Sequence, residues 1–227
     1  MCGRYTLRHS WRRLHDLYRL TVDLEPVPEG VEPRYNAAPS QALPIIGERG
    51  ARRSVILSRW GMIPPWAEGP GDSRISTINA RAENLETSKL YGPCWHVRRC
   101  LVPADGWYEW RQMGKARQPH FITRTDAAGF AFAGLWSVWR GVDGTPIVSH
   151  AIVTTAAVPA LADIHERMPL VLDPGDYDDW LRAPAPPRHL LRAHPGSWAE
   201  WPVSPRVGKV AENDPGLTEP APTAALF

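Results

Sequence analysis

The sequence has few cysteines, little net charge and no long apolar run. With 3 Cys in 227 residues and no CxxC spacing, neither a disulfide framework nor a cysteine-based metal site is expected. The formal net charge of +2 excludes a uniformly cationic surface, so that any nucleic-acid site would have to be a local arginine patch. No apolar run approaches the length of a membrane span, and the N-terminus lacks the apolar segment of a secretory signal. We therefore expect a cytoplasmic protein (nucleoid-associated if bacterial) with no metal, no cofactor and no membrane contact, in which Cys94 and Cys100 are buried reduced thiols.

Tryptophan and proline, in contrast, are abundant. The 24 Pro favour many turns and few long helices. The 11 Trp exceed what a core needs, so some of them could line a groove or stack on a ligand. No internal repeat and no linker divides the chain, which predicts one domain over residues 1–211 followed by a disordered tail over residues 212–227.

Short segments with strand periodicity alternate with turn residues along most of the chain. Strands are expected at residues 4–7, 42–46, 54–60, 106–110, 120–124, 129–138, 147–155, 170–172 and 198–203. Short helices are expected at residues 11–20, capped by Ser10, at 83–90, 160–164 and 174–181. Residues 34–39 are expected to form a turn, and Gly92-Pro93 a break. This order predicts an α+β fold, a single domain with a mainly antiparallel, barrel-like β core flanked by short helices.

Cys2 combines two nucleophiles if Met1 is removed by the cell's methionine aminopeptidase. The α-amine titrates at about pH 7.7–8.0, so a usable fraction is neutral at physiological pH. The thiol, with an ordinary pKa of about 8.5, lies two atoms away. An amine condenses with an aldehyde to an imine, and a neighbouring thiol can then close a five-membered ring. The other interpretation is that Cys2 is simply the residue after the initiator.

Three polar residues lie in positions suited to proton transfer or orientation. Asn79 stands at the boundary of a strand and a helix, where it could face a ligand or merely cap the helix. Glu109 alternates with aromatic residues in a strand, which would raise its pKa, although the sequence alone slightly favours an edge-strand carboxylate with its head in water. His165 has an ordinary pKa near 6.5 and could carry protons, but a single histidine is more often structural.

The proline pair in residues 61–66 (GMIPPW) excludes a helix interior or a central strand. Met62, Ile63 and Trp66 would then lie on a rigid loop, where they could pack on the core or stack beside bases of single-stranded nucleic acid.

Four stretches occur together in this order: MCGRY at residues 1–5, NARAE at 79–83, GWYEW at 106–110 and HERMP at 165–169. In this combination the chain resembles the SRAP family, named for SOS-response-associated peptidase. RYNAAP at 34–39, the segment 60–66 and TTAA at 154–157 are similar to the same family. The resemblance spans almost the whole chain, from residue 2 to about residue 203, and does not cover the tail.

The resemblance implies a protein that recognises abasic sites in single-stranded DNA and crosslinks itself to them through a thiazolidine, with weak lyase and crosslink-reversal activity. Carried over by position, the catalytic residues are Cys2, Asn79, Glu109 and His165. The implied DNA contacts lie beside these residues or in the same motifs: Arg4, Asn36, Met62, Trp66, Arg81, Thr154 and Arg167. The protein is expected to act as a monomer. Two alternatives remain open, a cysteine peptidase that processes its own Met1 with His165 as base, and a non-catalytic single-strand binding module.

Overall fold

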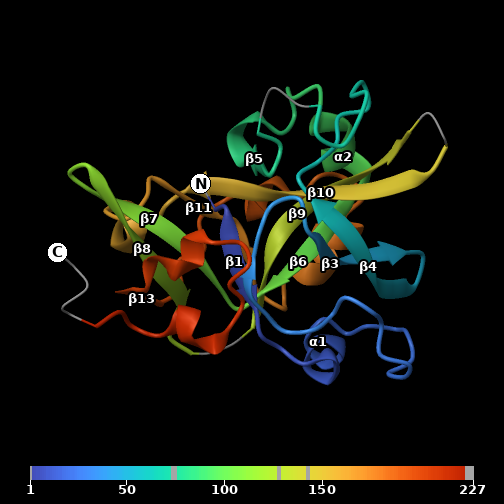
Figure 1. The fold of residues 1–227 in the computed structure, drawn as a ribbon. Coiled ribbons are helices and arrows are strands. Elements are labelled where there is room, and N and C mark those ends of the chain that lie inside the picture. The colour runs from blue at the N-terminus through green and yellow to red at the C-terminus, as the bar shows by residue number, and fades with distance from the viewer. Residues whose placement is uncertain (1, 73–75, 127–128, 142–143, 223–227) are drawn as a thin grey trace.

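Five long strands form a closed barrel at the centre of the molecule (Figure 1). The computed structural model describes residues 2–72, 76–126, 129–141 and 144–222. The barrel strands are β3 (Ala42–Arg49), β4 (Arg52–Trp60), β6 (Arg99–Ala104), β9 (Phe130–Arg140) and β10 (Pro146–Ala156). They pair in the order β10-β4-β3-β6-β9, and β9 pairs with β10 to close the ring. Every pairing in the ring is antiparallel except that of β10 with β4, which confirms the predicted barrel-like, mainly antiparallel core.

A second sheet packs beside the barrel and has the order β13-β8-β7-β1-β2. It consists of β1 (Arg4–Leu7), β2 (Arg34–Ala37), β7 (Gly106–Met113), β8 (Ala116–Arg124) and β13 (Trp198–Pro202). The N-terminal strand β1 therefore lies inside a sheet, between β2 and β7.

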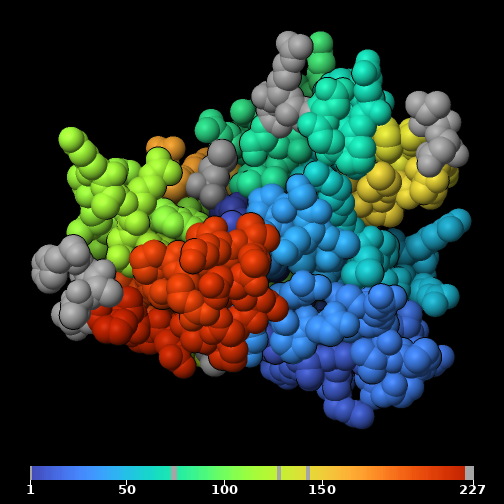
Figure 2. Space-filling model, in the orientation of Figure 1, coloured from blue at the N-terminus to red at the C-terminus, as the bar shows by residue number. Residues whose placement is uncertain are grey.

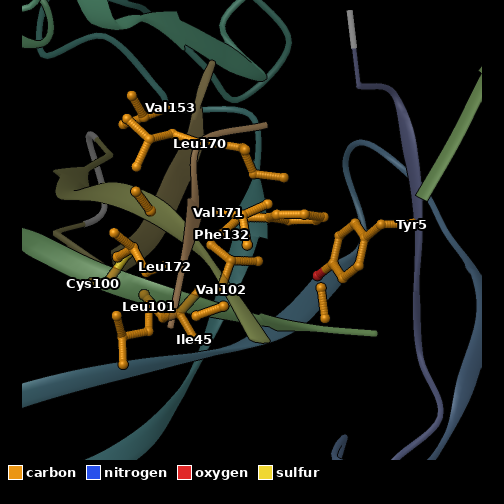
Figure 3. Packing of buried hydrophobic residues seen from close by; sticks show 14 of the residues in the cluster. Tyr5, Ile45, Cys100, Leu101, Val102, Phe132, Val153, Leu170, Val171 and Leu172 are labelled. Carbon is orange, nitrogen blue, oxygen red and sulfur yellow. The ribbon is translucent and has the colours of Figure 1, made fainter. Parts of the chain in front are cut away.

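The two faces of this sheet bury different clusters, because side chains alternate along each strand. Trp107 faces the main core, where its ring meets Phe132 at 6.0 Å. Tyr108 faces the other way and packs with Phe121 at 5.2 Å. From β1, Tyr5 points its ring toward the barrel interior (Figure 3) and meets Phe132 at 5.8 Å. These contacts fasten β1 and β7 to the barrel.

Short elements complete the fold. The helices are α1 (Trp11–Leu17), α2 (Gly92–Val97), α3 (Pro159–Ala162) and α4 (Tyr177–Arg182), with 3-10 turns η1 (Ala82–Asn84), η2 (Arg188–Leu190), η3 (Pro205–Gly208) and η4 (Pro215–Thr218). The small strands are β5 (Asn79–Arg81), β11 (Arg167–Pro169) and β12 (Val171–Leu172). Over the described ranges, no helix has the length and apolar character needed to cross a membrane.

Three local predictions differ from the structure. Residues 34–39, expected as a turn, begin with β2, because the backbone of residues 34–37 pairs with β1. The helix expected over residues 83–90 is limited to η1 and further turns. The Gly92-Pro93 break instead starts α2, since proline is well accommodated in the first helical turn.

The segment after residue 211, expected to be disordered, is packed against the second sheet as far as residue 222. Asn213 accepts hydrogen bonds through Oδ1 from the backbone N–H groups of Tyr35 (2.7 Å) and Asn36 (3.2 Å). Leu217 is fully buried with Tyr108 and its neighbours. This segment is held by one buried apolar side chain and a few hydrogen bonds. Its amino-acid composition therefore does not predict that it is ordered. Figure 2 shows the C-terminal segment in red as a broad layer beside the blue N-terminal third.

Candidate functional site

Asn79 binds the backbone of Cys2. β5 carries Asn79 because it pairs in parallel with β10, with Asn79 opposite Ile152. The Asn79 side chain donates from Nδ2 to the carbonyl oxygen of Cys2 at 2.8 Å, while Tyr91 Oη donates to the Asn79 carbonyl at 3.1 Å. Asn79 Oδ1 is buried and has no hydrogen-bond partner among the described residues. Asn79 therefore holds the Cys2 backbone rather than capping a helix, and retains an acceptor beside it.

The Cys2 side chain is fully buried. Its thiol lies 3.8 Å from the carbonyl oxygen of Arg4. Burial raises the pKa of the Cys2 thiol well above its ordinary value, and the negative charge of nearby Glu109 raises it further. The thiol is therefore protonated at neutral pH.

Glu109 lies in the middle of the second sheet, where β7 is flanked by β1 and β8. Only 3% of its surface is exposed. Burial raises the pKa of the Glu109 carboxyl to about 7, because the charged form loses its hydration. The predicted rise is thus confirmed, and the alternative of an edge-strand carboxylate in water is excluded. Near pH 7 both protonation states of Glu109 are populated.

His165 lies between α3 and β11. Its Nδ1 accepts a hydrogen bond of 2.9 Å from the backbone N–H of Arg167. Burial lowers the pKa of His165, which favours the neutral ring. A neutral ring whose Nδ1 is an acceptor carries its proton on Nε2.

A pocket of about 310 Å³ brings Glu109 and His165 together. Its other lining residues are Trp110, Gln112, Arg117 and Ile164. With Cys2 beside Glu109 and hydrogen-bonded to Asn79, all four predicted catalytic residues converge on one place, next to the N-terminus (Figure 1).

Arg117 and Gln112 are pocket residues that the sequence interpretation did not identify. Arg117 Nε donates to Gln112 Oε1 at 3.1 Å, across the hairpin in which the two residues pair. The sequence contained a signal for this hairpin, because glycine is favoured in tight turns. In the structure Gly114 lies between the two strands with a φ of 59°. Arg117 adds a cationic side chain to the pocket lining.

The predicted DNA contacts on the loop after β4 fall into two groups. Trp66 is 62% exposed, as a stacking residue must be. Met62 and Ile63 are buried instead, and their backbone N–H groups are bound by the Thr77 carbonyl at 3.1 Å and by Ser149 Oγ at 2.9 Å. The stacking role expected for Met62 does not fit this arrangement, because its side chain belongs to the core.

Arg4 and Asn36 contact the backbone of residues 207–212 rather than solvent. Arg4 Nη1 donates to Asn36 Oδ1 at 3.1 Å and to the Val207 carbonyl at 2.6 Å. Asn36 is 2% exposed and donates from Nδ2 to the carbonyls of Val207, Lys209 and Glu212. In this conformation both side chains hold these residues in place, which differs from the expected DNA contacts.

Arg81, Thr154 and Arg167 lie side by side. Arg81 is exposed and pairs with buried Thr154 across β5 and β10. Arg167 donates to the Thr154 carbonyl at 2.7 Å and forms a two-pronged ion pair with Glu83, at 2.7 and 3.0 Å. Arg81 presents its charge to solvent, whereas that of Arg167 is partly neutralised.

Within the described residues, no group of three or more His, Cys, Asp or Glu side chains is arranged to hold a metal ion. Cys94 and Cys100 are buried and free of disulfides, as predicted.

Comparison with known proteins identifies close relatives of the chain. The family model described as "SOS response associated peptidase (SRAP)" matches residues 1–210. YoqW of Bacillus subtilis (strain 168), named abasic site processing protein, is 35% identical over 228 residues, covering 96% of this chain and 99% of YoqW. YedK of Escherichia coli (strain K12), which carries the same functional name, is 34% identical over 231 residues, covering 97% and 100%.

Solved structures share the fold. A protein from Bacteroides thetaiotaomicron superposes with a TM-score of 0.85 over 97% of this chain and 100% of its own, at 23% identity. A protein from Bordetella bronchiseptica has a TM-score of 0.76 at 28% identity, covering 89% and 100%.

Proposed function

Since the chain belongs to the SOS response associated peptidase (SRAP) family, we propose that it processes abasic sites in single-stranded DNA by linking Cys2 to them. Relatives that match nearly the whole chain are named abasic site processing proteins. The observation that carries the proposal is the juxtaposition of Cys2, bound by Asn79, with the pocket formed by Glu109 and His165.

The amine of Cys2 acts first in the proposed reaction. Once Met1 is removed, this amine attacks the C1′ aldehyde of the ring-opened deoxyribose, forming a carbon–nitrogen bond and a carbinolamine. Loss of water then gives an imine. The Cys2 thiol is a poor early nucleophile, because burial keeps it protonated.

The thiol then closes the ring. Its sulfur forms a bond to the imine carbon and its proton is transferred to the nitrogen, which gives a thiazolidine without an external oxidant or reductant. An imine that is not closed withdraws electrons from C2′ and permits β-elimination of the 3′ phosphate. A weak lyase activity accompanies the reaction for this reason, and ring closure suppresses it.

Glu109 and His165 supply the proton transfers. A carboxyl with a pKa of about 7 both donates and accepts protons efficiently near neutral pH. Glu109 is therefore the residue proposed to assist sugar opening, dehydration and the reversal of the crosslink. The Nε2–H of His165 is suited to donate a hydrogen bond to the opened sugar hydroxyl and hold it in place.

Asn79 orients the nucleophile. Its Nδ2 already binds the Cys2 carbonyl, and its unpartnered Oδ1 can accept a hydrogen bond from the attacking amine or from the carbinolamine hydroxyl. This fixed geometry reduces the entropy lost on the way to the transition state.

DNA is proposed to contact the exposed cationic and aromatic groups around the pocket. Arg81 and Arg117 can bind phosphates, and Trp66 can stack on a base next to the lesion. A site without a base costs little to unstack, which contributes to selectivity.

A denaturing gel tests the proposal. A single-stranded oligonucleotide carrying an abasic site should give a shifted protein band with the wild type and none with Cys2→Ala or with a blocked N-terminal amine. Cys2→Ser is the matched variant, because its side chain is close to cysteine in size. Both variants retain the amine and lack the thiol, so that cleaved DNA should exceed stable crosslink.

Three results would contradict the proposal. The absence of a shifted band despite complete removal of Met1 would exclude crosslinking. Binding that is non-covalent and unaffected by Cys2→Ala would favour a single-strand binding module, whereas cleavage of peptides in trans would favour the peptidase.

A further inference from the structure

A second hollow, of about 520 Å³, lies where the loop after β4 meets the β9–β10 hairpin, apart from the pocket of Glu109 and His165. Its lining residues are Pro65, Arg98, Val138, Trp139 and Arg140. We propose that it binds nucleotides of the single strand that flank the abasic site on one side. This inference rests on the proposed function.

The composition of the hollow suits single-stranded nucleic acid. Its described lining contains two arginines, one tryptophan and no carboxylate, the combination with which proteins hold a phosphate backbone and stack bases without reading sequence. Arg98 and Arg140 are both exposed. Their guanidinium groups are therefore accessible to a phosphate.

The aromatic and cationic groups are held in position. The Arg98 guanidinium lies 5.8 Å from the ring centroid of Trp136, an arrangement that orients a cation by its attraction to the ring face. The Trp139 indole donates from Nε1 to the carbonyl oxygen of Ala67 at 3.0 Å. Arg140 donates from Nη1 to the Gly144 carbonyl at 3.2 Å. Little side-chain entropy would be lost when a strand binds.

The hollow is continuous with the residues proposed to receive the lesion. Exposed Trp66 follows directly after Pro65, and the bond from Trp139 to Ala67 fastens this loop to β9. At its other end, the loop binds the Thr77 carbonyl through Met62, two residues before Asn79. Figure 2 shows the teal surface of this loop in contact with the yellow surface of the β9–β10 hairpin.

The distance between the two sites follows from the register of β10. Asn79 pairs with Ile152, and Trp139 pairs with Ile147. Five strand residues at about 3.3 Å each correspond to roughly 17 Å along β10, and the two strand spacings of about 4.8 Å between β5 and β9 bring the separation to about 19 Å. At the ~3.4 Å spacing of a helically stacked strand, this is about five nucleotides, and fewer if the strand is extended. Nucleotides beyond this length on that side should add little affinity.

The test varies the length of the DNA flank and compares two double variants. Each replaces two exposed arginines by alanine, one pair in the hollow and one pair elsewhere on the surface. Wild type, Arg98→Ala/Arg140→Ala and Arg49→Ala/Arg52→Ala are compared by fluorescence anisotropy on intact single strands of increasing length, and by crosslinking to abasic strands with zero to eight nucleotides on either side. Arg49 and Arg52 are exposed, and they line a hollow of about 560 Å³ on the β3–β4 turn, whose described lining includes Asp23 and no aromatic residue.

Wild type and the Arg49/Arg52 variant should bind and crosslink more strongly as one flank grows to about five nucleotides. The Arg98/Arg140 variant should lose this dependence, and the slope of log affinity against log salt should fall by about 1.4, because each phosphate contact on a single strand contributes about 0.7. Arg98→Lys/Arg140→Lys should restore most of the slope.

Either of two results would overturn the inference: an unchanged slope and flank dependence in the Arg98/Arg140 variant, or an equal loss in the Arg49/Arg52 variant. Absence of a wild-type crosslink at every flank length would contradict the proposed function alone. The anisotropy measurements on intact strands would still test binding in the hollow. Crosslinking by the Arg98/Arg140 variant to a strand with minimal flanks should remain at the wild-type rate.

Discussion

Replacing Glu109 by glutamine should change the pH dependence of stability in a way that measures its burial. Burial raises the pKa of Glu109 from the ordinary 4.5 to about 7. The native protein therefore holds a proton that the unfolded chain releases between these pH values. Stability falls as pH rises through this window, because the unfolded state binds fewer protons than the native state. The loss is complete above about pH 7.

The size of the effect follows from the two pKa values. A pKa difference of one corresponds to about 1.4 kcal/mol, so the rise from 4.5 to about 7 corresponds to roughly 3 kcal/mol of stability forfeited at alkaline pH. The amide introduced by Glu109→Gln cannot ionise and escapes this loss. Relative to wild type, Glu109→Gln should thus gain up to about 3 kcal/mol between about pH 4.5 and pH 8, whatever constant offset the amide introduces.

Urea unfolding at several pH values between about 4 and 9 measures this difference. Glu29→Gln is the control, because Glu29 is exposed, and its stability difference from wild type should not change by a comparable amount. A difference between Glu109→Gln and wild type that is flat over the range would refute the burial argument, and with it the reason for assigning proton transfer to Glu109. The same variant should slow crosslink formation or reversal more than it weakens DNA binding.

Three further variants test other parts of the structure. His150 is fully buried, and burial lowers its pKa to about 3. Below about pH 6.5 the native state therefore binds fewer protons than the unfolded state, so stability should rise with pH in this range. In urea unfolding, the stability of His150→Leu should rise less steeply with pH than that of the wild type. Asn36→Ala removes the amide whose Nδ2 hydrogen-bonds the carbonyls of Val207, Lys209 and Glu212, so it should destabilise the protein by about 2 kcal/mol or more and speed proteolysis after residue 204; wild-type resistance would show that residues 207–212 are held otherwise. Arg117→Ala should lower the salt slope of DNA binding by about 0.7 and leave the circular dichroism spectrum unchanged, and an unaltered slope would remove Arg117 from the DNA contacts.

Four of the five barrel strands, β3, β4, β9 and β10, were predictable because each is an apolar segment bounded by turn residues. The fifth, β6, was not predicted, because all of its residues are buried and it shows no alternation of buried and exposed positions. The boundaries of β3, β4, β9 and β10 extend beyond the predicted ones by a few residues, as hydrogen bonding to neighbours lengthens a strand past its hydrophobic pattern. A barrel-like core was predicted, but the sequence did not indicate that β9 and β10 close the ring. Strand order depends on contacts between distant segments, which periodicity does not contain.

Elements stabilised from outside their own sequence were not predictable. β2 has no strong strand pattern and exists because β1 and the C-terminal segment supply partners for its backbone. The same holds for residues 212–222, whose low hydrophobicity resembles that of a disordered tail. Burial of Leu217 and the bonds of Asn213 decide the outcome there.

The candidate site was predictable as a set of residues and not as a geometry. Cys2, Asn79, Glu109 and His165 are far apart in the chain, and only the motifs grouped them. The structure shows that Arg4 and Asn36 face residues 207–212, that Met62 is buried and that Arg117 lines the pocket. Each of these differences arises from tertiary contacts that a single sequence does not encode locally.

The position of β1 constrains the order of events during synthesis. β1 is synthesised about one hundred residues before its partner β7. In the folded protein Cys2 is fully buried and its carbonyl is bound by Asn79, so an aminopeptidase could not draw this end of the chain into its own active site. If the protein reacts through the Cys2 amine as proposed and does not process its own Met1, we expect the aminopeptidase to remove Met1 while the chain is still growing, and molecules that fold first to be inactive. The enzyme that trims the nascent chain, and not the lesion, would then set the fraction of molecules competent to react.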